Sequence, residues 1–124
     1  MTHLDTSFLV RAFVAGTPQS VRLDRWLDEE RLLGISAPAW AEFMCGPVPP
    51  AVVRAAADAL GIPVPFGVQA AVTAAECFNS SGRRRRTMVD CMIAATAITD
   101  AADLATSNVA DFERFVPLGL RLAT

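Results

Sequence analysis

The sequence has no lysine, no tyrosine and only three cysteines. The cysteines are odd in number and show no C-x-x-C spacing, which argues against both a disulfide framework and a zinc site. We therefore expect buried free thiols at Cys45, Cys77 and Cys91. The missing lysine means that all eleven basic residues are arginine.

Long apolar runs are also missing, although 52% of the residues are hydrophobic. No run reaches the roughly 18 residues that a membrane-spanning helix needs, because Asp90 interrupts the longest candidate. The N-terminus lacks the basic segment of a secretion signal and carries Asp5 where such a signal would be apolar. We therefore expect a cytoplasmic protein that makes no contact with membranes.

A length of 124 residues suits one domain with a sizeable core, and no linker or repeat divides the chain, so we expect a single domain over residues 1–124. The formal net charge of −2 would ordinarily argue against a nucleic-acid partner. The positive charge is concentrated, however, in four consecutive residues: Arg83, Arg84, Arg85 and Arg86. Such a run is either a solvated loop or a surface for a polyanion.

Apolar spacing predicts strands that alternate with helices along the whole chain. This alternation is typical of an α/β fold with a mostly parallel sheet covered on both faces, so we expect a three-layer α/β/α domain with about four to five strands. The predicted strands lie near residues 3–5, 32–35, 104–106 and 118–122, and the predicted helices over residues 8–15, 18–30, 51–60, 67–79, 88–99 and 108–115, with another from about residue 37. Residues 62–66 contain two prolines and are expected to form an edge strand or an extended connector.

Four acidic residues lie where a short apolar segment ends or a helix begins: Asp5, Glu42, Asp90 and Asp111. Two carboxylates about 5 Å apart repel by about 3 kcal/mol at an effective dielectric constant of about 20, so a cluster of four needs a cation. Ligands gather at the carboxyl ends of parallel strands, where these residues can converge. Oxygen-only ligands favour Mg²⁺ or Mn²⁺. Taken singly, each residue can instead be a helix cap or a first-turn acid.

The order and spacing of these motifs resemble the PIN-domain family, and within it the VapC-type toxins of bacterial toxin–antitoxin pairs. The resemblance covers essentially the whole chain. It rests on four segments, LDTS at residues 4–7, SAPAWAE at 36–42, DCMIAA at 90–95 and ATSNVADF at 105–112. Each motif is weak alone, but the four in order with these intervals are specific.

The resemblance implies roles for individual residues. The acidic quartet would bind Mg²⁺, for which Mn²⁺ can substitute, and would hydrolyse RNA phosphodiester bonds. Thr6 and Thr106 match small polar positions that orient ligands or water. Asn108 is an alternative to Asp111 as the fourth site residue. The four consecutive arginines would contact the RNA backbone beside the metal.

The implied protein is a Mg²⁺-dependent endoribonuclease that acts as the toxin of a VapBC-type pair. Its implied partners are RNA, a small antitoxin, and a second copy of itself, in a homodimer and in a toxin–antitoxin hetero-oligomer. Two other functions fit the same residues: a catalytically weak RNA- or protein-binding module of this fold, and a PIN nuclease that processes RNA without an antitoxin. The intact acidic quartet favours an enzyme over the binding module.

Overall fold

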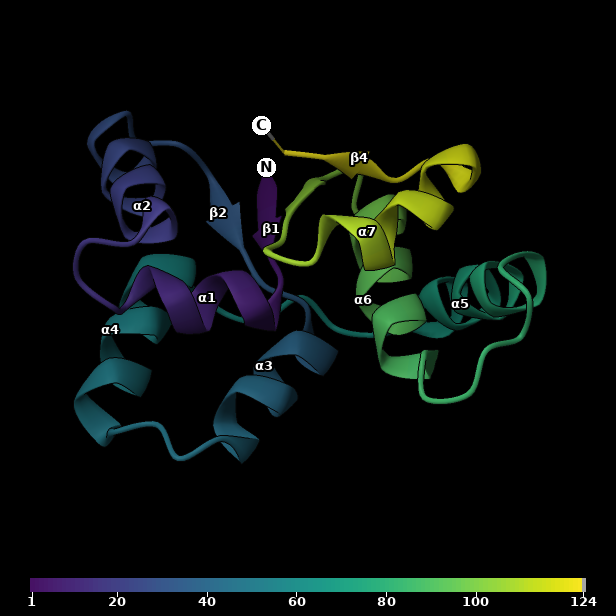
Figure 1. Ribbon diagram of the computed structural model, residues 1–124, viewed down its shortest axis with the longest axis horizontal. Coiled ribbons are helices and arrows are strands. Elements are labelled where there is room, and N and C mark those ends of the chain that lie inside the picture. Colours follow the sequence, from purple (N-terminus) through teal and green to yellow (C-terminus); the bar gives the residue numbers. More distant parts are fainter. Residues whose placement is uncertain (124) are drawn as a thin grey trace.

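The computed structural model describes residues 1–123, which fold around a four-stranded, fully parallel sheet with the strand order β2-β1-β3-β4 (Figure 1). The strands are short: β1 is Thr2–Leu4, β2 is Leu33–Gly34, β3 is Asp103–Ala105 and β4 is Arg121–Leu122. The helices are α1 (Thr6–Ala12), α2 (Pro18–Asp28), α3 (Ala37–Cys45), α4 (Pro50–Leu60), α5 (Val68–Ser80), α6 (Met88–Thr99) and α7 (Val109–Phe112), followed by a 3₁₀ helix, Glu113–Leu118. The predicted α/β class is confirmed.

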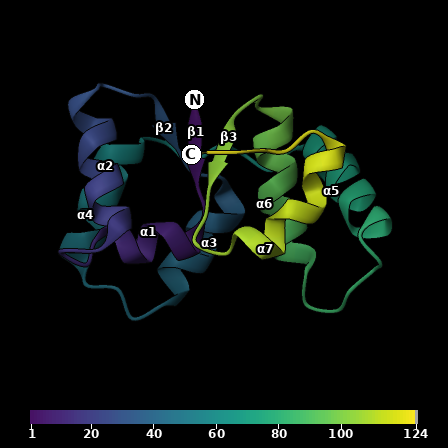
Figure 2. The same cartoon turned by 45° about the horizontal axis from the view of Figure 1, so that its top comes forward.

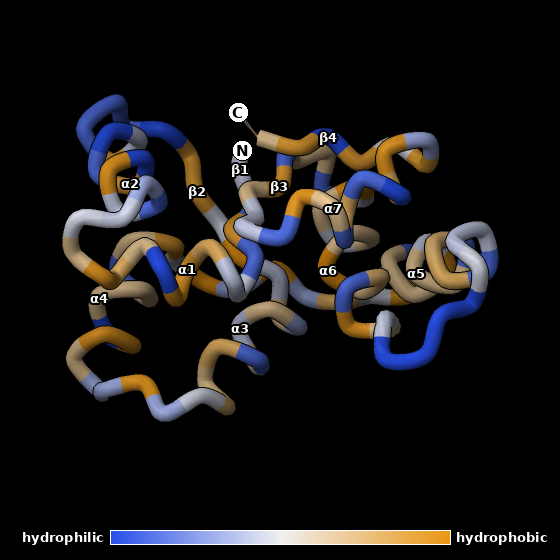
Figure 3. The backbone as a smooth tube through the Cα atoms, viewed as in Figure 1, coloured by the Kyte–Doolittle hydropathy of each residue, from blue (hydrophilic) through white to orange (hydrophobic). Residues whose placement is uncertain are grey.

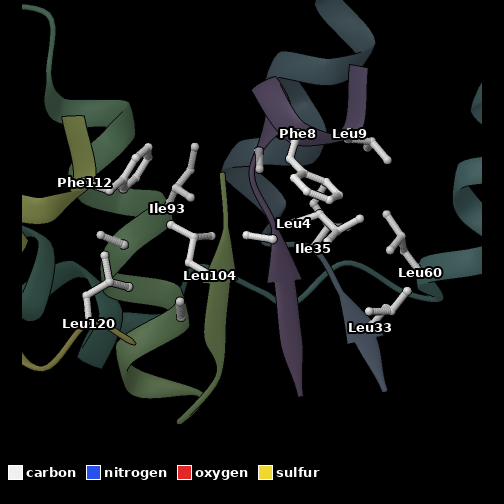
Figure 4. Packing of buried hydrophobic residues seen from close by; sticks show 14 of the residues in the cluster. Leu4, Phe8, Leu9, Leu33, Ile35, Leu60, Ile93, Leu104, Phe112 and Leu120 are labelled. Carbon is white, nitrogen blue, oxygen red and sulfur yellow. The ribbon is translucent and has the colours of Figure 1, made fainter. Parts of the chain in front are cut away.

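The helices lie on both sides of the strands. Figure 2 shows α1, α2 and α4 on one side and α5, α6 and α7 on the other. In Figure 4, Phe8 and Leu9 of α1 point toward Ile35 and Leu60, while Ile93 of α6 points toward Leu104 and Phe112. The central strand β1 is buried along its whole length, as expected for a parallel strand covered on both faces.

Local capping sets where two of these helices begin. Ser36 accepts a hydrogen bond from the backbone N–H of Ala39, and proline stands in the first turn of α3, where its missing N–H is harmless. Thr17 caps α2 in the same way through the N–H of Ser20. Helix α6 follows the predicted range of residues 88–99 and is buried along most of its length between α5 and the sheet.

Several predicted boundaries differ from the structure. The helix predicted over residues 8–15 begins earlier, at Thr6, because the chain turns from β1 into α1 at the single extended residue Asp5 (φ −74°, ψ 155°). The last strand is shorter than predicted, since residues 113–118 form the 3₁₀ helix. Residues 62–66 make only one bridge, between Val64 and Ser36. Cys45 is exposed, so the prediction of a buried thiol was wrong there. In the described part of the chain, no helix has the length and hydropathy needed to span a membrane.

Candidate functional site

The register of β1 against β3 brings two distant polar residues together at the carboxyl edge of the sheet. Leu4 pairs with Ala105, and the N–H of Asp5 donates to the carbonyl of Ala105 at 2.8 Å. The next residues along each strand, Asp5 and Thr106, therefore lie side by side. The Thr106 hydroxyl donates to Oδ2 of Asp5 at 2.8 Å, although the two residues are 101 positions apart in the sequence.

The Asp5 carboxylate is the centre of a hydroxyl network and not a helix cap. It occupies the N-cap position of α1, but its side chain makes no capping hydrogen bond. Its Oδ2 also accepts a hydrogen bond from the Ser7 hydroxyl at 2.8 Å. The Ser7 oxygen in turn accepts from the N–H of Ser107 at 3.1 Å, which ties the loop after β3 to α1. Asp5 is only 4% exposed, so this network fixes a buried carboxylate.

Glu42 reaches the same edge from the second turn of α3. The Thr6 hydroxyl lies 3.0 Å from Oε1 of Glu42 and 3.1 Å from the carbonyl of Ala39, and its single hydrogen can donate to one of them at a time. Thr6 thus orients Glu42 next to Asp5. This matches the orienting role that the sequence resemblance implied for Thr6, although the role itself stays a prediction.

Asp90 stands in the first turn of α6, and its surroundings are strongly acidic. The pKa of the Asp90 carboxyl is raised to about 6, mainly by burial and then by the charges of Asp5, Glu42 and Asp111, while Arg114 opposes the shift. The other three predicted carboxylates are therefore close enough to act electrostatically on Asp90. A group whose pKa is displaced by burial together with neighbouring charges is a typical member of a functional site.

The carboxylates border a hollow of about 260 Å³ at the sheet edge. Six residues line it: Asp5, Thr6, Ser7, Glu42, Asp90 and Asn108. We call it the acidic hollow. Asp111 is exposed and is not among these lining residues, so its charge reaches Asp90 from outside, whereas Asn108 lines the hollow directly.

The acidic hollow offers oxygen donors in the combination that a hard divalent cation prefers: carboxylates, hydroxyls and one amide. Within residues 1–123, no three His, Cys, Asp or Glu side chains converge closely enough to form a ready-made metal site. Mutual repulsion favours such separation of like charges. The pKa of Asp90 is nevertheless raised first by burial and then by three neighbouring carboxylates, and a cation would offset both effects. The chemistry of the donor set therefore fits a divalent cation.

Two residues near the acidic hollow were not identified from the sequence. Ser7 lies in the LDTS segment without a predicted role in the site, yet its hydroxyl donates a hydrogen bond to Asp5. Arg114 places Nη2 at 3.8 Å from Oδ2 of Asp90, and its guanidinium stacks on the Phe115 ring at 4.8 Å. Its Nε is buried without a hydrogen-bond partner among the described residues. The SNVADFER segment carries no local pattern that marks Arg114, because its link to Asp90 exists only in the packed structure.

The four consecutive arginines form an exposed loop between α5 and α6, which is the most hydrophilic stretch at the lower right of Figure 3. Arg83 and Arg86 adopt positive φ angles of 52° and 64°, so the loop is tightly turned. In the described part of the chain, none of the four pairs with a carboxylate within 4.0 Å. The loop leads within one turn of helix to Asp90 and leaves its charges free for an anionic partner.

Comparison with known proteins identifies a family for most of the chain. The family model of the PIN domain matches residues 3–116. Among solved structures, VapBC2 from Rickettsia felis bound to a promoter DNA fragment superposes with a TM-score of 0.79 at 20% identity, covering 98% of this chain and 96% of that chain. DNA-bound VapBC from Salmonella typhimurium has a TM-score of 0.76 at 25% identity, with the same two coverages, 98% and 96%.

A third similar structure is VapBC-5 from Mycobacterium tuberculosis, described as a member of a family of toxin–antitoxin systems. Its TM-score is 0.64 at 22% identity, and the match covers 98% of each chain. No curated protein matches the sequence significantly.

Proposed function

Because the chain belongs to the PIN domain family, whose model matches residues 3–116, we propose that it is a divalent-metal-dependent endoribonuclease. We further propose that residues 1–124 form a single nuclease domain and that it acts as the toxin of a toxin–antitoxin pair. The observation that carries the proposal is the acidic hollow, where carboxylates from three separate segments of the chain meet at the carboxyl edge of the sheet.

In this proposal Asp5, Glu42 and Asp90 hold the cation, which is Mg²⁺ or Mn²⁺. Two residues are candidates for the fourth position of the site. Asn108 is supported because it lines the hollow, and Asp111 is supported because its charge raises the pKa of Asp90. A bound divalent cation lowers the pKa of a coordinated water and polarises a phosphate oxygen. Thr6, Ser7 and Thr106 keep the carboxylates oriented through the hydroxyl contacts described above.

The lining of the acidic hollow has no histidine, lysine or cysteine that could serve as a general base. Asp90 is a lining carboxyl whose pKa is raised to about 6 by burial and by neighbouring carboxylates. This composition supports hydrolysis with a metal-activated water over a mechanism in which a side chain attacks the phosphate. It also separates the proposed activity from that of nucleases that depend on histidine.

The first test measures how melting temperature and RNA cleavage depend on a divalent cation. We expect Mg²⁺ or Mn²⁺ to raise the melting temperature in a concentration-dependent way, because a ligand that binds only the folded state stabilises it by about 2.7 kcal/mol at one hundred times its Kd. RNA cleavage should require the same cation and stop in EDTA. If neither melting nor cleavage responds to millimolar Mg²⁺ or Mn²⁺, the RNA- or protein-binding module becomes the better assignment.

The proposed partner is a small antitoxin, as in the VapBC complexes to which this chain is similar. A basic group of that partner, such as an arginine, would satisfy the carboxylates of the acidic hollow in place of the cation. We therefore expect antitoxin and Mg²⁺ to compete. Titration of Mg²⁺ against a fixed amount of the complex measures this, and an antitoxin affinity that is independent of Mg²⁺ would contradict the mechanism. We also propose that the chain forms a homodimer within a toxin–antitoxin hetero-oligomer.

We also propose that Arg83, Arg84, Arg85 and Arg86 hold the RNA backbone. Each phosphate neutralised on single-stranded RNA contributes about −0.7 to the slope of log affinity against log salt, so loss of two to four contacts should flatten the slope by roughly 1.5 to 3 units. The measurement is RNA affinity across a salt series with all four arginines replaced by alanine, in a catalytically inactive background.

Arg54→Ala is the matched control for the arginine loop, since Arg54 is an exposed arginine on α4. The control should leave the salt dependence unchanged. If the slope of log affinity against log salt is unchanged in the fourfold variant, the arginine loop is a solvated turn that does not contact RNA. In an otherwise active protein, a cleavage position changed by the same fourfold replacement would mean that the arginines read bases and do not only hold phosphates.

A further inference from the structure

A second hollow, of about 400 Å³, lies next to the acidic hollow between α3 and the start of α6. Its lining residues are Pro38, Ala41, Glu42, Cys45, Val89 and Met92. We call it the apolar hollow. Glu42 is its single charged residue, and the rest of the wall is aliphatic or sulfur-containing.

The composition of this wall indicates which class of ligand the apolar hollow can bind. It contains no cation and no backbone loop that would bind a phosphate, and its one carboxylate repels anions. A hollow of a few hundred Å³ with mostly apolar walls and one polar group is typical of a site for a flat, largely apolar ligand. Met92 and Val89 offer polarisable and branched surfaces for contact with such a ligand.

The two hollows are neighbours, since Glu42 lines both of them. Helix α6 also contributes to both, through Asp90 in the acidic hollow and through Val89 and Met92 in the apolar hollow. The exposed arginine loop runs directly into this end of α6 (Figure 1). An RNA phosphate at the carboxylates would therefore bring an adjacent nucleoside close to the apolar hollow.

Resting on the proposed function, we propose that the apolar hollow binds the base of a nucleotide adjacent to the cleaved phosphate. The base packs its face against Val89 and Met92, while the acidic hollow and the arginine loop hold the phosphates on either side. Because burial of apolar surface is non-directional, the site accepts all four bases and fixes the position of the strand more than its sequence.

Cys45 gives a direct probe, because it is exposed on the wall of the apolar hollow while Cys77 and Cys91 are buried. The experiment measures the rate of Cys45 alkylation by N-ethylmaleimide in the full-length Asp5→Asn protein with Mg²⁺. A saturating single-stranded ten-nucleotide RNA should slow alkylation by at least about fivefold, because a base that buries its apolar surface against this wall also covers the thiol. Ribose 5-phosphate, which has the phosphate but no base, should leave the rate unchanged.

Ala41→Trp tests the same site from the protein side by filling the apolar hollow from an exposed position on α3. It should weaken binding of the same RNA by about 5- to 100-fold, because the indole occupies the space in which the base would bury its apolar surface. Ala55→Trp, at an exposed position on α4, is the matched control and should bind RNA as the parent does. Melting curves of both variants establish that they fold.

Three outcomes would overturn the inference. If RNA binds but Cys45 stays fully reactive, the base lies elsewhere and the proposed nuclease function is unaffected. If no RNA binds to the Asp5→Asn protein, the proposed function and the base site fail together. If Cys45 becomes protected as protein concentration rises without RNA, a second copy of the chain covers the apolar hollow.

Discussion

Replacement of Asp5 by asparagine should reduce RNA cleavage by at least about a thousandfold, more than the ten- to hundredfold that follows loss of a residue supporting a metal ligand. Asp5 is buried and central to the acidic hollow, so its charge is not replaced by solvent or by a neighbour. Asparagine retains an oxygen that can accept the hydroxyl hydrogens of Ser7 and Thr106. The fold should therefore survive the change.

The same variant should melt at the same or a higher temperature than the parent in EDTA. Removal of one of several clustered negative charges relieves repulsion that a cation otherwise offsets. Cleavage rate and melting temperature, measured on the same preparation, test both parts of this expectation.

Asp58→Asn is the matched control for Asp5, because Asp58 is an exposed aspartate on α4. It should change neither activity nor metal response. Asp111→Asn should have an effect between those of Asp5→Asn and Asp58→Asn, since Asp111 acts on Asp90 by charge and lies outside the lining of the acidic hollow. We expect it to lose less activity than Asp5→Asn. Full activity in Asp5→Asn would refute the assignment of the site.

Asp90→Asn should stabilise the metal-free protein in a pH-dependent manner. The pKa of Asp90 is raised from 3.8 to about 6 in the folded state, so the folded protein binds a proton more tightly than the unfolded chain does. The stability contributed by the protonated carboxyl is complete below pH 3.8 and is lost as the pH rises through about 6. At pH 7 to 8 the ionised carboxylate is therefore a net destabilising group, and an amide removes it.

The expected gain from Asp90→Asn is on the order of 3–5 °C in melting temperature at pH 7.5, after allowance for the partial exposure of Asp90. The gain should shrink as the pH is lowered from 6 and vanish near pH 4. Asp58→Asn should show no such pH dependence. Thermal melts in EDTA across this range give the measurement, and a gain that does not vary with pH would show that burial and the neighbouring carboxylates do not raise the pKa of Asp90.

Addition of Mn²⁺ or Mg²⁺ should reverse the order of stability at pH 7.5. The parent protein gains stability from the bound cation, whereas Asp90→Asn has lost one of its ligands and gains less. RNA cleavage by Asp90→Asn should fall together with this response. A variant that keeps its full metal response would place the cation away from Asp90.

The sequence alone determined the class of fold and three of the site's acidic residues. Alternating apolar segments predict a parallel sheet because burial on both faces demands short, continuous apolar strands between helices. Asp5 and Asp90 stand out locally, since a carboxylate next to an apolar segment is costly unless something pairs with it. Helix α6 was predicted at its observed bounds because its apolar pattern is uninterrupted except at Asp90.

Only the tertiary structure decided which side chains meet. Asp5 and Thr106 are 101 positions apart, and Thr6 and Glu42 are 36 apart, so the strand register and the docking of α3 bring each pair together. The same packing places Arg114 at Asp90, turns Asn108 into the acidic hollow and leaves Asp111 outside it. Local sequence patterns report burial and helix boundaries, because these depend on neighbours in the chain. The positions of side chains from separate elements depend on strand register and helix packing, which no single segment encodes.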